Sequence, residues 1–282
     1  MKFDEIASLS EKLSETDSRN EKIGLISDFL KSLRPEDLTR ACRMIIGRAF
    51  PKSSQKKTKV SKKSLLNALS KIAETEKYDQ YYDKYGDFGE VIGRLISEEA
   101  KKQSTLRTEE NSLESVQNFL NELNETEGKG SIKKREKLIE ARFSQLNRLG
   151  SKYLSKILLG SSRHGVSDGL VARAIAKAWN APVEEVRTAY MITGDIGKVA
   201  ELTKNKELGK VEIKYHRPFL PMLAEMSDSA GDIKEELGYC LCEEKLDGVR
   251  IQIHKDGEIK FYTRNLNRVT SNFPELVKGL KK

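Results

Sequence analysis

The feature of this sequence that most constrains its fold is an internal repeat. Residues 85–95 have the sequence YGDFGEVIGRL and residues 193–202 have the sequence TGDIGKVAEL, so a G-D-x-G turn occurs twice before an amphipathic run. When the two turns are aligned, the similarity extends backwards. Val60-Ser61 and the apolar run after it lie opposite Val166-Ser167 and a similar run.

Each repeat also has an upstream helix signal that ends at a glycine, Gly47 in the first repeat and Gly160 in the second. The predicted unit is therefore a helix, a polar loop, a second helix and a G-D-x-G turn into a third helix. Glycine allows the positive φ that such a turn needs, and aspartate caps the amides that follow. One unit cannot bury its own apolar faces, so we expect two packed units, at about residues 36–100 and 135–205.

The segments around the repeats also indicate helices. Residues 1–34 contain two apolar stripes at helical spacing, separated by Ser18-Arg19-Asn20-Glu21, which fits a capping box. Residues 101–131 are polar with one helix signal near Leu113–Leu123, so we expect them to link the units. Residues 1–215 are predicted to form one all-helical domain.

The pattern changes to that of a sheet in residues 216–282. The segment GYCLCEEK, residues 238–245, is predicted to be a short strand, with both cysteines packed in the core. Alternating residues from Val249 follow, and Asp256-Gly257 predicts a tight hairpin turn into the return strand EIKFYTR.

Composition narrows the class of protein. The net charge of +8 is compatible with a polyanionic partner, although charge alone does not prove one. No stretch reaches the ~18 consecutive apolar residues of a membrane span, so we expect no membrane contact. Three cysteines and no secretory signal favour a reducing cytoplasm.

Two equivalent loops carry chemistry that suits phosphate oxygens. Residues 52–63 hold six lysines and no acid, and residues 160–169 combine cations, serines and exposed glycine amides before a predicted helix. An isolated lysine run is usually a solvated loop, but two such loops at matching places favour contact with a nucleic-acid backbone. The predicted DNA-binding residues are Lys56, Lys57, Lys59, Arg163, His164, Gly165 and Ser167.

The most informative motif is E-x-K-x-D-G-x-R, which runs from Glu243 to Arg250. It sets Lys245 among acids, beside a glycine turn and an arginine. A hairpin that ends at Thr263-Arg264-Asn265 follows it, and the run PFLPMLAEM precedes it. These features together resemble the nucleotide-binding motif and the next arginine motif of ATP-dependent DNA ligases, particularly the archaeal and eukaryotic replicative type. The two G-D-x-G turns and the R-H-G-V-S loop resemble the DNA-binding domain of that family, so the resemblance covers the whole chain. His164 and Ser167 depart from the loop pattern usual in the family.

The resemblance implies an all-α DNA-binding domain of two helical repeats and then an incomplete α+β nucleotidyltransferase (adenylation) domain. Lys245 would be the nucleophile that takes up AMP from ATP, provided that its environment lowers its pKa. Glu243 would contact adenine, Arg250 and Arg264 the ribose and phosphates, while Asp247 and Gly248 would shape the turn.

The resemblance also implies partners and cofactors. Nicked duplex DNA would be the substrate, with roles in replication, repair and recombination, and Mg²⁺ would assist the chemistry. We expect no metal ligands in these residues, a monomer, and a cytoplasmic location at the nucleoid. A sliding clamp is a candidate partner that the sequence does not resolve, and it does not resolve ATP from ADP or NAD as AMP donor.

Two other classes of protein remain as alternatives. RNA ligases and mRNA-capping guanylyltransferases share K-x-D-G but lack such a helical front domain, and a helical DNA-binding protein with an accidental lysine motif is the non-enzymatic alternative. The later motifs of a ligase do not occur before Lys282, so we expect this polypeptide alone to join little or no DNA.

Overall fold

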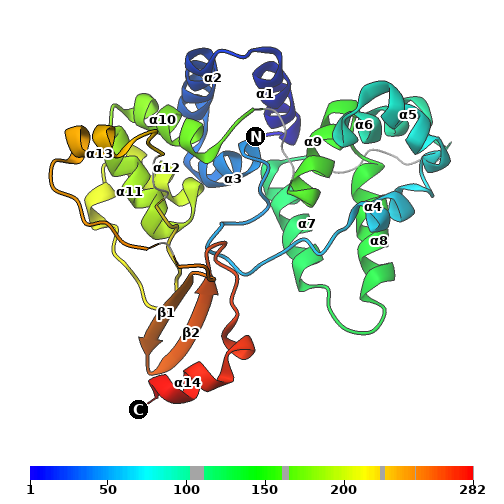
Figure 1. Ribbon diagram of the computed structural model, residues 1–282. Helices are drawn as coiled ribbons and strands as arrows, with labels where there is room; N and C mark the ends of the chain where they lie inside the picture. Colours follow the sequence, from blue (N-terminus) through cyan, green and yellow to red (C-terminus); the bar gives the residue numbers. More distant parts are fainter. Residues whose placement is uncertain (102–110, 161–164, 223–225, 245, 282) are drawn as a thin grey trace. The chain divides into compact units, whose positions relative to one another are not determined.

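The computed structural model describes residues 1–282 apart from 102–110, 161–164, 223–225, 245 and 282 (Figure 1). The chain divides into two compact units, Met1–Val211 and Glu212–Lys282. Among the described residues, no helix combines the length and apolar character needed to cross a bilayer.

The first unit is built from helices. They are α1 (Phe3–Glu15), α2 (Arg19–Ser32), α3 (Pro35–Ile45), α4 (Lys62–Leu69), α5 (Tyr78–Tyr85), α6 (Phe88–Glu98), α7 (Leu113–Glu125), α8 (Ser131–Phe143), α9 (Arg148–Leu159), α10 (Asp168–Trp179), α11 (Val183–Thr193) and α12 (Ile196–Lys204), with short 3₁₀ turns at Thr75–Lys77 and Leu208–Lys210.

The repeat is confirmed, with one correction to its content. The first repeat is α3 to α6 and the second is α9 to α12, so each has four helices where the sequence pattern predicted three. The additional helices are α5 and α11, which lie just before the two G-D-x-G turns. The α5 sequence, YDQYYDKY, is rich in tyrosine and has little apolar periodicity, so the pattern did not reveal it.

The two G-D-x-G turns have the same local geometry. Gly86 and Gly194 end α5 and α11 with φ of 65° and 62°, a left-handed conformation that favours glycine. The aspartate after each glycine caps the next helix. Asp87 accepts a hydrogen bond from the Glu90 amide, and Asp195 accepts one from the Gly197 amide.

Each repeat packs its last helix against the first helix of the other repeat. Helix α6 of the first repeat packs on α9 of the second, while α12 of the second packs on α3 of the first. The last glycine of each turn lies where the two helices approach closely. A Cβ on Gly197 would lie 2.3 Å from the Thr39 carbonyl oxygen, and one on Gly89 would lie 2.8 Å from the Lys152 carbonyl oxygen.

An ion pair accompanies each of these helix crossings. Asp195 accepts two hydrogen bonds from the Arg43 guanidinium, the one from Nε at 2.8 Å, and Asp87 lies 3.0 Å from Lys156 Nζ. Arg43 stands four residues before Gly47, and Lys156 stands four residues before Gly160. The two pairs therefore occupy equivalent positions in the two repeats.

The other helices complete the core of this unit. Helix α2 packs beside α10, α1 packs on α9, and α8 packs on α4 (Figure 1). Ser18 caps α2 as expected, but Glu21 accepts a hydrogen bond from the Thr16 hydroxyl, and the Ser18 amide donates to that same hydroxyl. Because the Ser18 amide donates to Thr16 and not to Glu21, the reciprocal half of the predicted capping box does not form. The largest fully buried side chains here include Phe3, Ile6, Leu13, Ile26, Leu30, Leu38, Met44, Ile45, Leu65, Leu69 and Phe143.

The second unit contains one antiparallel hairpin. Strand β1 (Ile251–Asp256) pairs with β2 (Glu258–Thr263), and Gly257 makes the turn with φ of 67°, as the Asp-Gly signal predicted. Helices α13 (Ala230–Leu237) and α14 (Pro274–Leu280) lie before and after it, and a 3₁₀ turn covers Thr270–Asn272.

The predicted strand at residues 238–245 is wrong over its described part, 238–244. These residues pair with no other described strand, and a strand without a hydrogen-bonded neighbour gains nothing from its extended backbone. Cys240 and Cys242 are exposed and free, so the prediction that they pack in the core is also wrong.

Candidate nucleic-acid interface and nucleotide-binding hairpin

The residues of the lysine motif precede β1 in the second unit. Glu243, Asp247, Gly248 and Arg250 are all exposed. Lys245 itself lies outside the described residues. No ion pair engages the charged groups of this motif in the described part of the chain, so they are open to a ligand.

The hairpin brings two predicted arginines to one end. Ile251 is paired with Thr263 in the last rung of the ladder, so Arg250 and Arg264 follow directly at the same end of the two strands. Both side chains are exposed. Two guanidinium groups beside a lysine motif fit the phosphates of a nucleotide, because arginine binds phosphate through paired donors.

The buried face of strand β1 carries polar side chains, and their hydrogen bonds fix the hairpin. Ile253 is 51% exposed, while Gln252 and His254 are buried. The Gln252 amide exchanges two hydrogen bonds with the Phe219 backbone, and His254 Nδ1 accepts one from the His216 amide at 3.1 Å. Burial, together with the neighbouring His216, lowers the pKa of His254. Segment 216–219 is thereby tied to β1 through side chains.

The first unit has a basic hollow of 620 Å³ at the start of α10. Two predicted residues, Gly165 and Ser167, line it, and the Ser167 side chain caps α10 by accepting from the Leu170 amide. Three arginines from different helices surround them: Arg19 on α2, Arg173 on α10 and Arg187 on α11. We call this cavity the arginine hollow.

The arginines of the hollow differ in their pairing. Arg187 forms an ion pair with Glu184 at 2.7 Å on its own helix. Arg19 and Arg173 form no ion pair with any described residue. Unneutralised cations around backbone amides at a helix start attract a phosphate group.

The shape of the hollow depends on Gly165. Its φ is 69°, and a Cβ there would lie 2.5 Å from Nζ of Lys22, a buried residue of α2. The glycine therefore lets the loop pass close to α2, which explains how Arg19, far away in the sequence, reaches the same hollow. Arg163 and His164, predicted from the same loop, lie outside the described residues.

The lysine-rich loop of the first repeat is tied down within the chain. The Lys59 ammonium forms an ion pair with Glu127 and donates to the Asn124 carbonyl at 2.8 Å, and the Lys57 amide donates to the Asn124 side chain. The side chains of Lys56 and Lys57 are exposed. Of the three predicted lysines, Lys59 is therefore the one whose charge is already neutralised.

Sequence reasoning missed Arg19, Arg173 and Arg187. Arg173 carried a usable signal, because it lies on the exposed face of α10 six residues after the cap. Nothing local could have indicated Arg19, since its place in the hollow depends on the packing of α2 against α10.

Comparison with known proteins agrees with the geometry. The family described as DNA ligase N terminus matches residues 2–176, and the family described as ATP dependent DNA ligase domain matches residues 221–282. The helical unit and the hairpin unit thus each correspond to one part of a ligase.

Curated relatives from archaea are similar along the whole chain. A DNA ligase of Methanocaldococcus jannaschii is 34% identical over 291 residues, covering 100% of this chain and 50% of the relative. DNA ligase 1 of Korarchaeum cryptofilum is 33% identical over 279 residues, covering 98% and 50%. A Thermococcus fumicolans DNA ligase is 34% identical, covering 100% and 51%.

These matches establish the class of protein. The chain belongs to the family of ATP-dependent DNA ligases. It spans about half the length of the curated relatives it matches.

Proposed function

We propose that this chain is the DNA-binding and nucleotide-attaching part of an enzyme that seals nicks in duplex DNA. The observation that carries the proposal is the hairpin, which sets Arg250 and Arg264 at one end beside the E-x-K-x-D-G-x-R motif. The family and the archaeal relatives favour this function over RNA ligation, mRNA capping or DNA binding without catalysis.

Each residue of the motif has a proposed role. The neutral amine of Lys245 attacks the α-phosphorus of ATP, which forms the nitrogen–phosphorus bond to AMP, breaks the bond to the β-phosphate and releases pyrophosphate. Positive charge from Arg250 and Arg264 favours the neutral amine by opposing its protonation. The same arginines bind the phosphates, and Glu243 accepts a hydrogen bond from the adenine amino group. Asp247 and Gly248 shape the turn between Lys245 and β1.

ATP, when bound, supplies the AMP that is passed to the 5′-phosphate of the nick. The exposed, unpaired arginines at the end of the hairpin fit its phosphates. Mg²⁺ would neutralise phosphate charge when bound, and the described residues include no group of three histidine, cysteine or acidic side chains that could hold it.

The helical unit is proposed to hold the DNA backbone. The arginine hollow and the exposed Lys56 and Lys57 contact phosphates, which carry affinity without sequence information. Arg163 and His164, which lie outside the described residues, are proposed to contact phosphates as well. An enzyme that closes any nick needs this independence of sequence. We further propose that it acts as a monomer at the nucleoid, with a sliding clamp as a candidate partner.

Nucleotide attachment is tested with radiolabelled ATP on the full-length protein. We expect a covalent adenylate that is lost in Lys245→Arg, because the guanidinium is a poor nucleophile. Lys260→Arg is the matched control, since Lys260 on β2 pairs with Glu258. Equal labelling of Lys245→Arg and wild type would refute the proposal.

DNA contact is tested by the affinity for nicked duplex at several salt concentrations. We expect Arg19→Gln and Arg173→Gln each to weaken binding about tenfold and to lower the salt slope by about one. Arg34→Gln, on an arginine that lines neither this hollow nor the motif, is the control. A flat salt response of the wild-type protein would remove the phosphate-contact role.

A further inference from the structure

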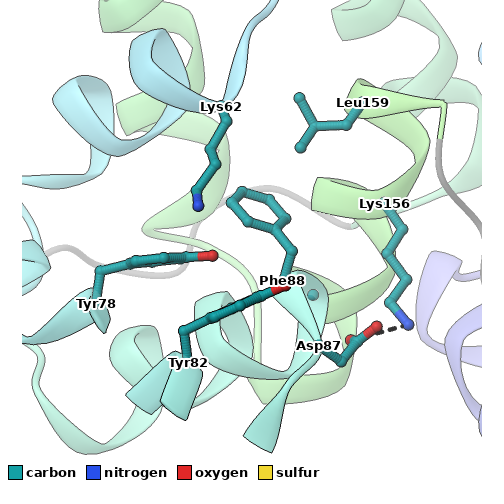
Figure 2. A pocket seen from close by; sticks show the side chains of 8 residues that line it. Lys62, Tyr78, Tyr82, Asp87, Phe88, Lys156 and Leu159 are labelled. Atoms are coloured by element: carbon teal, nitrogen blue, oxygen red, sulfur yellow. Dashed lines mark ion pairs between the residues drawn. The ribbon is translucent and has the colours of Figure 1, made fainter. Parts of the chain in front are cut away.

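A second cavity of the helical unit is lined by aromatic rings and a lysine (Figure 2). Its volume is 170 Å³, and it lies between the start of α4, helix α5, the first turn of α6 and the end of α9. The rings of Tyr78 and Tyr82 are stacked with centroids 5.6 Å apart, and Phe88 closes the wall. We call it the Lys62 pocket.

The hydroxyl of Tyr78 is the unsatisfied group of this pocket. Tyr78 is 5% exposed, and among the described residues no group lies at normal hydrogen-bond distance from its hydroxyl; the Lys62 ammonium makes only a longer approach to it. A buried hydroxyl without a partner costs free energy, so such groups mark places where a ligand completes the structure. The hydroxyl lies on the side of the ring that faces the pocket (Figure 2).

Lys62 lies over the same rings. Its Nζ is 4.2 Å from the centroid of the Tyr78 ring and 5.2 Å from that of Tyr82. Burial raises the pKa of Tyr78, and the Lys62 ammonium opposes that effect through its approach to the hydroxyl and through its charge. No carboxylate of the described residues pairs with Lys62, so its contacts are the ring faces and the Tyr78 hydroxyl, and its charge remains available.

The other charges of the pocket cancel. Asp87 is 3.0 Å from Lys156 Nζ, and Figure 2 shows this ion pair at the edge of the cavity away from Lys62. The carboxylate is thus neutralised, and Lys62 leaves one net positive charge. Lys63, the next residue of α4, is also exposed.

We propose that the Lys62 pocket binds one phosphate group of a DNA strand, with the Lys62 ammonium and the Tyr78 hydroxyl as donors to its oxygens. The ammonium moves off the rings to the anion, which uncovers the hydroxyl. The inference rests on the proposed DNA binding and adds a contact point on the first repeat that the arginine hollow does not include. Free inorganic phosphate has the same chemistry as a DNA phosphate. A competition experiment between inorganic phosphate and nicked duplex distinguishes the two ligands.

The test measures the affinity of the 282-residue chain for nicked duplex. We expect Lys62→Gln and Tyr78→Phe each to weaken binding about tenfold, because each removes one donor to an ionised oxygen. Lys62→Gln also lowers the salt slope by about one, and Tyr78→Phe leaves it unchanged because no charge is lost. Lys63→Gln is the matched charge control, with an expected effect of about twofold.

Stability separates a binding role from a structural one. Tyr78→Phe removes an unpartnered buried hydroxyl and keeps the ring, so we expect the melting temperature to stay equal or to rise while DNA affinity falls. A packing role would lower both.

Single phosphates of the duplex are then replaced by neutral methylphosphonate, one position at a time. We expect one position that weakens wild-type binding about tenfold and weakens Lys62→Gln binding less than about twofold, since the partner is already absent. Millimolar inorganic phosphate should not displace the duplex beyond its effect as salt, and specific displacement would assign the pocket to the free anion instead.

Two failures are distinguishable. If Lys62→Gln behaves like Lys63→Gln and Tyr78→Phe binds as wild type does, the pocket is not a phosphate site, although the proposed DNA binding stands. If the wild-type chain does not bind nicked duplex at all, the proposed function of the helical unit fails and this inference fails with it.

Discussion

The basic residue that meets the G-D-x-G aspartate is a lysine at one crossing of the two repeats and an arginine at the other. Lys156 makes one contact with Asp87, whereas Arg43 makes two with Asp195, and Asp195 is the more buried of the two carboxylates. Both crossings have a glycine where the helices approach closely. The two repeats therefore share the way their helices pack on each other, while the ion pair at each crossing differs.

The surfaces of the two repeats diverge further. The first repeat presents a lysine loop and the aromatic Lys62 pocket, while the second presents the arginine hollow. A common scaffold with two different phosphate-compatible surfaces can contact a DNA backbone at two points without symmetry in the contacts. This division implies that changes at the crossings affect stability and changes at the surfaces affect binding.

The largest expected effect comes from filling the closest crossing. Gly197→Ala places a Cβ 2.3 Å from the backbone oxygen of Thr39, so α12 must move away from α3. We expect a loss of about 3 kcal/mol in the free energy of unfolding, measured by denaturant titration of helical ellipticity, after allowing for the better helix propensity of alanine.

Gly89→Ala sharpens the comparison, because its nearest obstacle is the flexible Lys156 side chain and the backbone oxygen of Lys152 is farther away. We expect a smaller loss of about 2 kcal/mol. Gly209→Ala, with no atom within 4 Å of its Cβ, should stay within about 0.5 kcal/mol of wild type. Equal stability of all three variants would contradict the close-crossing argument.

The next effect concerns the ion pairs. Asp195→Asn keeps the helix cap but removes the charge that faces Arg43, and we expect it to cost about 2 kcal/mol because the guanidinium is left half-buried without its partner. Asp87→Asn should cost about 1 kcal/mol, since the Asp87 side chain is 28% exposed, against 13% for Asp195, and makes a single contact with Lys156. The reverse order in thermal unfolding would show that the single lysine contact is the stronger one.

The helical repeats and the hairpin were predictable because their signals are local. A G-D-x-G turn and an Asp-Gly turn each require particular residues at fixed positions, so Gly194 and Gly257 indicate them directly. The packing of α6 and α12 against the other repeat was not predictable, because periodicity shows which face of a helix is buried and not which neighbour covers it. Residues 238–244 failed for the same reason, since a strand is defined by its partner.

The candidate site likewise has residues that local sequence indicates and residues that only tertiary packing brings into place. The lysine motif was found from the spacing of Glu243, Lys245 and Arg250, which one sequence shows. Arg19 was missed because it reaches the arginine hollow only through the packing of α2 on α10. The inward Gln252 was missed because its partner is the backbone of Phe219.

A pH-dependent effect distinguishes the two crossings. Burial would raise the pKa of Glu90, but hydrogen bonds from Arg148 and Lys152 and their charges lower it to about 2. The equivalent residue of the second repeat is Lys198, which is exposed and pairs with Glu201. Only the crossing of α6 and α9 therefore contains this acid-sensitive group.

The sign follows from the depressed pKa. Glu90 stabilises the fold above its unfolded pKa of about 4.3, and this contribution is lost as the pH falls towards 2. We expect the free energy of unfolding to fall between about pH 5 and 2, and to fall less steeply in Glu90→Gln. An identical slope in Glu201→Gln and Glu90→Gln would contradict a special role for this carboxylate.

The smallest expected effect concerns the helix starts that follow the two loops. Ser61 caps α4 by accepting from the Ser64 amide at 3.1 Å, and Ser167 caps α10 by accepting from the Leu170 amide at 3.3 Å. Alanine at either position leaves one amide of the first turn without a partner, so we expect each variant to lose about 1 kcal/mol.

Comparing the two alanine variants shows whether the two caps contribute equally to the free energy of unfolding, although the loops before them differ in surface chemistry. Ser97→Ala, whose hydroxyl bonds only its own helix on an exposed face, should lie within about 0.5 kcal/mol of wild type. Equal losses at Ser61 and Ser167 would mean that selection has kept the start of each helix constant while the loop before it changed. A negligible loss at Ser61 alone would mean that Ser64, which donates back to the Ser61 carbonyl, already holds the start of α4 without the cap.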